Sequence, residues 1–120
     1  MASILIVDDS MLTRITLRRI LEEAEHEIVG EARDGVEALL MYTNKRPDLV
    51  TMDLTMPKTD GMEAIQNIIN RFPDARIVVI SAIGHKLKVL EAIESGAKNY
   101  IVKPFDSQKV LQVLQKVLAN

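Results

Sequence analysis

The chain has 120 residues, of which 48% are hydrophobic and 27% charged, with a formal net charge of −2. This suits one globular domain: no apolar run approaches the about 20 residues that a bilayer needs, and the charge gives no general attraction to nucleic acid. The absence of cysteine excludes disulfides, and the N-terminus lacks the basic start of a secretory signal, so we expect a cytoplasmic protein.

Short runs rich in β-branched residues alternate along the chain with longer segments of helical periodicity, which predicts five strands and five helices. The predicted strands cover residues 3–8, 27–32, 48–53, 76–82 and 98–102. Four of them are apolar throughout, as strands covered on both faces should be. In residues 27–32 acidic residues alternate with apolar ones, which indicates an edge strand.

The segments between and after these strands carry the apolar stripes of helices that pack on a core. The predicted stripes are Leu12, Ile15, Ile20, Leu21 and Ala24 in the first helix, Ile65, Ile68, Ile69 and Phe72 in the third, and Val110, Val113, Leu114, Val117 and Leu118 in the last. Asp34 with Glu37 and Asp60 with Glu63 have the spacing of capping boxes, and Gly96 is a predicted helix end. Because no linker or low-complexity segment interrupts this order, residues 1–120 are predicted to form one domain.

Strands and helices in strict alternation predict an α/β fold with a doubly wound, five-stranded parallel sheet. In such sheets a ligand site lies beyond the carboxyl ends of the strands. Polar residues follow four of the predicted strands at that point: Asp8 and Asp9, Asp53, Ser81, and Lys103. We therefore expect three carboxylates, a hydroxyl and an ammonium group to converge at one edge of the sheet.

Carboxylates gathered this closely repel one another, and a hard divalent cation such as Mg²⁺ would relieve the repulsion. The same groups suit phosphoryl transfer, because the cation and Lys103 neutralise the phosphoryl oxygens while Asp53 attacks. Taken singly, each group has a simpler explanation. Asp8 and Asp9 are in the position of a helix cap, and Lys103 with Pro104 in that of a strand exit. Their occurrence together at the strand ends favours the functional interpretation.

Four segments, "ILIVDDS", "DLVTMDLTMPKTDGMEAI", "IVVISA" and "GAKNYIVKPF", resemble the signature segments of the response-regulator receiver domain, in that family's order. The resemblance runs from Ser3 to the C-terminus. It implies the flavodoxin-like strand order 2-1-3-4-5 and a magnesium-dependent phosphorylation switch. Asp53 would be the phosphoacceptor, and Asp8 and Asp9 would hold the metal together with Asp53 and the Thr55 carbonyl.

The same resemblance implies roles for the remaining strand-end residues. Ser81 would be the switch hydroxyl, Lys103 the cation that pairs with the phosphate, and Tyr100 the aromatic that turns from exposed to buried. The peptide bond between Lys103 and Pro104 would be cis. The chain would be no enzyme beyond assisting its own phosphorylation and dephosphorylation.

Within the family, the segments "TMDLTMP" and "SAIGHKLKVLEAIESGAKNYIVKPF" are most similar to stand-alone chemotaxis regulators. This implies a histidine kinase as phosphodonor, a phosphatase as a further partner, and the flagellar motor switch as the output partner. We expect a monomer whose partner binds the face of the fourth helix, fifth strand and fifth helix. If the chain is part of a longer regulator, the output is different, and a receiver of another two-component pathway remains the alternative.

Three other classes of protein fit parts of the pattern. A flavodoxin-like redox protein would share the fold, but the loop after the first strand is acidic where a cofactor phosphate would sit. A haloacid-dehalogenase-like phosphatase would also use an aspartyl phosphate. Its motif after the first strand, however, resembles Asp-x-Asp, whereas this chain has Asp8 followed directly by Asp9. A receiver-like scaffold that never takes phosphate would lack one of the required groups.

Overall fold

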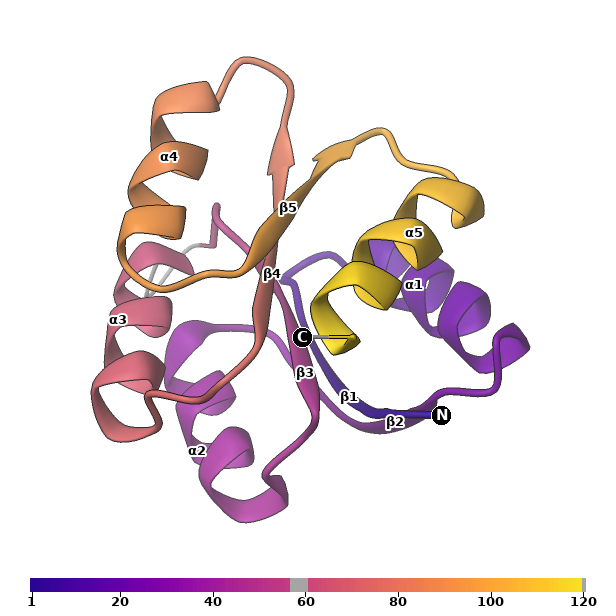
Figure 1. Ribbon diagram of the computed structural model, residues 1–120, viewed down its shortest axis with the longest axis horizontal. Coiled ribbons are helices and arrows are strands. Elements are labelled where there is room, and N and C mark those ends of the chain that lie inside the picture. The colour runs from indigo at the N-terminus through magenta and orange to yellow at the C-terminus, as the bar shows by residue number, and fades with distance from the viewer. Residues whose placement is uncertain (57–60, 120) are drawn as a thin grey trace.

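The computed structural model of the chain describes residues 1–56 and 61–119. Its centre is a five-stranded parallel sheet in the order β2-β1-β3-β4-β5 (Figure 1). The strands are β1 (Ser3–Val7), β2 (Glu27–Ala32), β3 (Leu49–Asp53), β4 (Ile77–Ala82) and β5 (Asn99–Lys103). The predicted fold class, the strand order and the edge position of β2 are thus confirmed.

Five helices cover both faces of the sheet, as the crossovers of parallel strands require. They are α1 (Met11–Glu23), α2 (Gly35–Lys45), α3 (Gly61–Arg71), α4 (Lys86–Glu94) and α5 (Ser107–Leu118). In Figure 1, α1 and α5 lie on one side of the sheet and α2, α3 and α4 on the other. No helix in the described part of the chain has the length and hydropathy needed to cross a membrane.

The sheet divides the hydrophobic core into two clusters. Strand residues Ile4, Ile6, Leu49, Ile80 and Ile101 pack with α1 and α5. Their neighbours Leu5, Val7, Val50, Met52 and Val79 pack with the helices of the opposite face. Successive side chains of a strand point to opposite faces, so each residue position at the carboxyl edge also belongs to one face or the other.

The predicted stripe of α1 is wrong in part. Leu12 is 75% exposed and Ile15 48% exposed, whereas Leu17, which the stripe omitted, is fully buried beside Leu21. At about 100° per residue, Leu12 and Ile15 lie about 140° and 160° around the helix from Leu17, so they cannot share its face. Helix α1 carries apolar residues on both sides, and apolar character alone did not identify the packed one.

The other helix predictions agree with the structure where it describes them. The stripes of α3 and α5 are buried or partly buried. Asp34 caps α2 by accepting from the N–H of Glu37 at 2.8 Å. Gly96 follows the end of α4 with φ 122°, a left-handed value that favours glycine. Asp60, the first residue of the other predicted capping box, lies outside the described residues.

Candidate phosphoryl and metal site

Asp8 and Asp9 lie between the end of β1 and the start of α1. The N–H of Asp8 donates to the carbonyl of Ala32 at 3.0 Å, which continues the pairing of β1 with β2 beyond the strand. Asp8 is 1% exposed, and its Oδ1 accepts from the N–H of Ser10 at 2.9 Å. Ser10 is the residue that caps α1. The N-cap of α1 is therefore Ser10 and neither aspartate, and the second oxygen of Asp8 is directed towards Lys103.

Asp53 is the last residue of β3 and is 5% exposed. Its Oδ1 accepts from the N–H of Thr55 at 3.1 Å, so the chain after the strand turns back over this carboxylate. The position of the Thr55 carbonyl as a metal ligand stays a prediction. Pro57, at the end of the same motif, lies outside the described residues.

Lys103 is the last residue of β5 and reaches both buried carboxylates. Its Nζ lies 3.4 Å from Asp8 Oδ2 and 3.9 Å from Asp53 Oδ1. Both distances exceed those of strong charge-assisted hydrogen bonds, so one ammonium group is shared between two acids at ion-pair range. The peptide bond from Lys103 to Pro104 is cis, as the resemblance implied.

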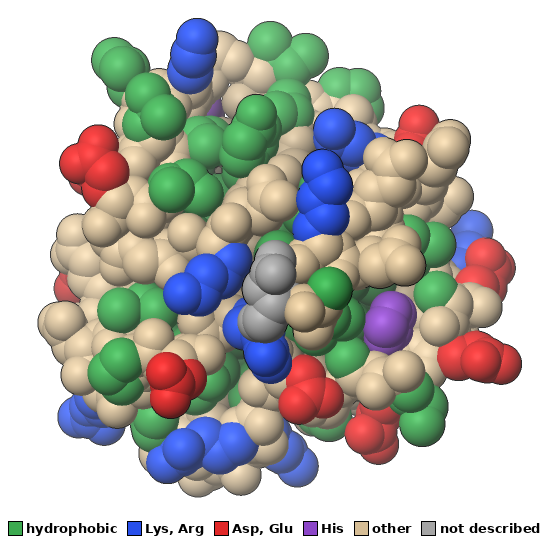
Figure 2. All heavy atoms as spheres, in the orientation of Figure 1, with side chains coloured by type: hydrophobic (Ala, Val, Ile, Leu, Met, Phe, Trp, Pro, Cys, Tyr) green, Lys and Arg blue, Asp and Glu red, His purple; other side chains and the backbone are tan. Residues whose placement is uncertain are grey.

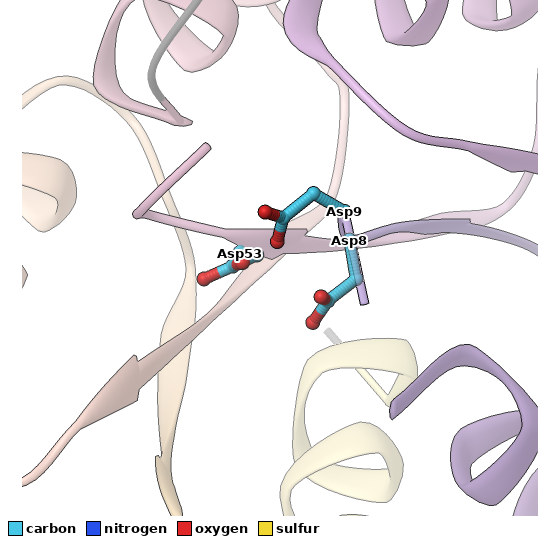
Figure 3. A group of neighbouring side chains, drawn as sticks. All are labelled: Asp8, Asp9 and Asp53. Atoms are coloured by element: carbon cyan, nitrogen blue, oxygen red, sulfur yellow. The ribbon is translucent and has the colours of Figure 1, made fainter. Parts of the chain in front are cut away.

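The three carboxylates form one cluster at the carboxyl edge of the sheet. One oxygen from each of Asp8, Asp9 and Asp53 lies within 4.8 Å of the others. Figure 3 shows the three side chains extending from two neighbouring places, the junction of β1 with α1 and the end of β3. Anionic oxygens at this separation are the donor set that Mg²⁺ or Ca²⁺ uses, and they fit the predicted metal.

The electrostatics of the cluster show the cost of leaving these charges together. Burial, and then the nearby charges of Asp8 and Asp9, raise the pKa of Asp53 to about 6 against the opposing effects of the Thr55 N–H and Lys103. One lysine therefore does not balance the acids. A divalent cation would supply the missing positive charge.

Ser81 and Tyr100 lie on a different face of the sheet from Asp53. Ser81 is buried, and its only described hydrogen bond is a long one of 3.4 Å to the carbonyl of Ala82. Tyr100 is 46% exposed and borders a cavity of about 310 Å³ between β5 and the start of α4. By strand alternation both belong to the face of the sheet that carries α4, while Asp53 and Lys103 belong to the face that carries α1 and α5.

Two features of the site were not predicted from the sequence. The first is Gly61, the first residue of α3: a Cβ built there would meet the carbonyl oxygen of Asp53 and lie 2.6 Å from Leu54 Cα. The second is Arg14, which donates to the backbone carbonyl of Asp8 at 2.8 Å and pairs with Glu31 of β2 at 2.9 Å. The quoted motif contains Gly61, but neither the close backbone approach at Gly61 nor the contacts of Arg14 leave a recognisable pattern in the sequence.

A family model described as the response regulator receiver domain matches residues 4–115, and the chain belongs to this family. It is therefore a signalling domain of two-component pathways.

Among curated proteins, the chemotaxis protein CheY of Listeria monocytogenes is 43% identical over 116 residues, which are 97% of this chain and 98% of that protein. The transcriptional regulatory protein DegU of Brevibacillus brevis is 34% identical over 95% of this chain but only 49% of its own length. A solved CheY from Borrelia burgdorferi, in complex with CheX, BeF₃ and Mg²⁺, superimposes with a TM-score of 0.94 at 41% identity, covering 98% of this chain and 90% of that one.

Proposed function

We propose that the protein is a magnesium-dependent phosphoacceptor switch in which Asp53 takes a phosphoryl group from a histidine kinase. The observation that carries the proposal is the position of Asp53. This carboxylate ends a buried strand, lies within 4.8 Å of two further acids, and has an ammonium group 3.9 Å away. The metal would be held by Asp8, Asp9, Asp53 and the Thr55 carbonyl. When bound, it would neutralise charge on the transferred phosphoryl oxygens.

In the transfer, a carboxylate oxygen of Asp53 attacks the phosphorus of a phosphohistidine. The new P–O bond forms as the P–N bond breaks, and the imidazole leaves with the electron pair and takes a proton from solvent. Attack requires the ionised carboxylate, which predominates above the raised pKa of about 6. Lys103, whose Nζ lies 3.9 Å from Asp53, would pair with a phosphoryl oxygen as Asp53 becomes an acyl phosphate and gives up its own charge.

The signal would leave the site through Ser81 and Tyr100. A phosphoryl group adds strong acceptor oxygens at the end of β3, which would attract the poorly bonded hydroxyl of the buried Ser81. Movement of Ser81 and the adjacent loop would open the cavity beside Tyr100 to its ring. The phenol would then pass from exposed to buried and change the α4-β5-α5 face.

Exposed apolar side chains on α4, on β5 and just after β4 support this proposal. Ile83, Leu87, Leu90 and Tyr100 are each at least 46% exposed. Figure 2 shows hydrophobic side chains gathered over the region of α4 and the adjoining end of β4. An apolar area beside the cavity suits a protein partner that recognises the rearranged surface.

For the pathway, we propose chemotaxis, with the flagellar motor switch as the output partner and a phosphatase that removes the signal. The support is the near-complete coverage of both chains in the match to the Listeria chemotaxis protein. The alternative is a receiver of another two-component pathway, which the similarity to part of DegU favours. In either case residues 1–120 would act as one domain, a cytoplasmic monomer that does not bind nucleic acid.

The chemistry is tested by incubating the protein with acetyl phosphate and MgCl₂ and recording intact-protein mass spectra. One phosphoryl group should be incorporated, and Asp53→Asn should incorporate none, while Asp48→Asn, an exposed acid outside the cluster, should behave as wild type. Incorporation at another residue of Asp53→Asn would contradict the assignment. The pathway is tested separately, by beryllofluoride-dependent capture of a purified motor switch protein.

A further inference from the structure

A partly buried arginine holds the peptide group that joins the two acids of the β1-α1 junction. Arg14 is the fourth residue of α1, and its side chain is 12% exposed. One terminal nitrogen of its guanidinium donates to the backbone carbonyl of Asp8 at 2.8 Å. This carbonyl belongs to the peptide that links Asp8 to Asp9, so the arginine contacts the backbone between two predicted metal ligands without touching either carboxylate.

Glu31 of β2 fixes the orientation of this guanidinium. Its Oε1 accepts from Arg14 Nε at 2.9 Å, and its Oε2 accepts from Arg18 at 2.8 Å. Glu31 pairs in register with Ile6, whose side chain packs on the α1 face, so strand alternation directs the glutamate towards α1. The acidic residue that marks β2 as an edge strand is thus the anchor of two arginines from the neighbouring helix.

We propose that Arg14, oriented by Glu31, is a positioning residue that sets the affinity of the acidic cluster for Mg²⁺. The inference rests on the metal site of the proposed function. Asp9 is exposed, and no described hydrogen bond holds its carboxylate, so its direction depends on the backbone that carries it. With the Asp8 carbonyl fixed by Arg14, the two carboxylates are held towards Asp53 before any cation arrives. Without that contact, cation binding would have to order the junction first.

The experiment compares Arg14→Gln with Arg18→Gln in titrations with MgCl₂ alone, followed by amide chemical shifts. Both substitutions remove one positive charge and one ion pair to Glu31, but only Arg14 contacts Asp8. We expect Arg14→Gln to weaken Mg²⁺ binding about tenfold, the range typical of residues that orient metal ligands, and Arg18→Gln to change it less than twofold. Glu31→Gln should weaken binding, and combining it with Arg14→Gln should add little.

A second measurement separates positioning from general loss of structure. With acetyl phosphate, the Mg²⁺ concentration for half-maximal phosphorylation of Asp53 should rise about tenfold in Arg14→Gln, while the rate at saturating Mg²⁺ stays within twofold of wild type. Equal effects of the Arg14 and Arg18 substitutions, or unchanged affinity in Arg14→Gln, would overturn the role of Arg14 alone. A wild-type protein without affinity for Mg²⁺ would overturn the metal site and this role together.

Discussion

Replacing Asp53 with asparagine should stabilise the metal-free protein at neutral pH. The structure raises the pKa of this carboxyl from 3.8 to about 6, chiefly by burial. The folded state therefore holds the proton more tightly than the unfolded state does. Between these two values the unfolded state binds fewer protons, so the free energy of unfolding falls as the pH rises. A difference of about two pKa units corresponds to about 3 kcal/mol of unfolding free energy lost above pH 7, and we expect Asp53→Asn to regain it.

The assay is thermal unfolding of wild type and Asp53→Asn in EDTA at several pH values. We expect the variant to melt about 10 °C higher at pH 7.5. This gap should narrow as the pH falls below about 6 and should vanish only below 3.8, where Asp53 is protonated in both states. Asp9→Asn, the same change at the exposed acid of the cluster, should give a smaller gain because solvent screens its charge. Equal stability of wild type and Asp53→Asn at pH 7.5, or a gap that does not depend on pH, would refute the reasoning.

Further predictions concern the metal, the glycine and the switch. Mg²⁺ should raise the melting midpoint of the wild type, by about 2.7 kcal/mol of stability at a hundredfold excess over its dissociation constant, and far less in Asp53→Asn; identical shifts in the two proteins would argue against the site. Gly61→Ala should cost about 1–3 kcal/mol in denaturant unfolding, because its Cβ meets strand backbone, and Gly30→Ala, which meets the end of the Met41 side chain, should cost less. Tyr100→Ala should keep phosphorylation of Asp53 but lose the phosphorylation-dependent gain in partner affinity, and a full gain measured by titration would exclude the tyrosine as the route.

The convergence of Asp8, Asp53 and Lys103 was predictable because parallel strands bring their carboxyl ends to one edge. No contact had to be known, since a residue type at the end of each strand was sufficient. The edge position of β2 was likewise readable from the alternation of glutamates with apolar residues. These patterns indicate where a residue lies along a strand and within the sheet, and the local sequence is sufficient to encode that position.

The contacts that complete the site were not predictable in the same way. The bond from Arg14 to Asp8 and the ion pair to Glu31 depend on how α1 rotates against β2. That rotation is decided by Leu17 and Leu21, and the apolar stripe chosen from the sequence included Leu12 and Ile15 on the opposite side. An error in the packed face of one helix therefore hides every polar contact that the face makes.

The division of the site between the two faces of the sheet limits which insertions and deletions the chain tolerates. Asp53 and Lys103 belong to one face, and Ser81 and Tyr100 belong to the other. Inserting or deleting one residue near the end of β3, β4 or β5 would move every later side chain of that strand to the opposite face of the sheet. Asp53 would then lie on the face that carries α4, and Ser81 or Tyr100 would lie on the face away from α4. Length variation among working relatives should therefore be concentrated at the opposite edge of the sheet, where loops such as the one through Glu25 and His26 connect helices back to strands.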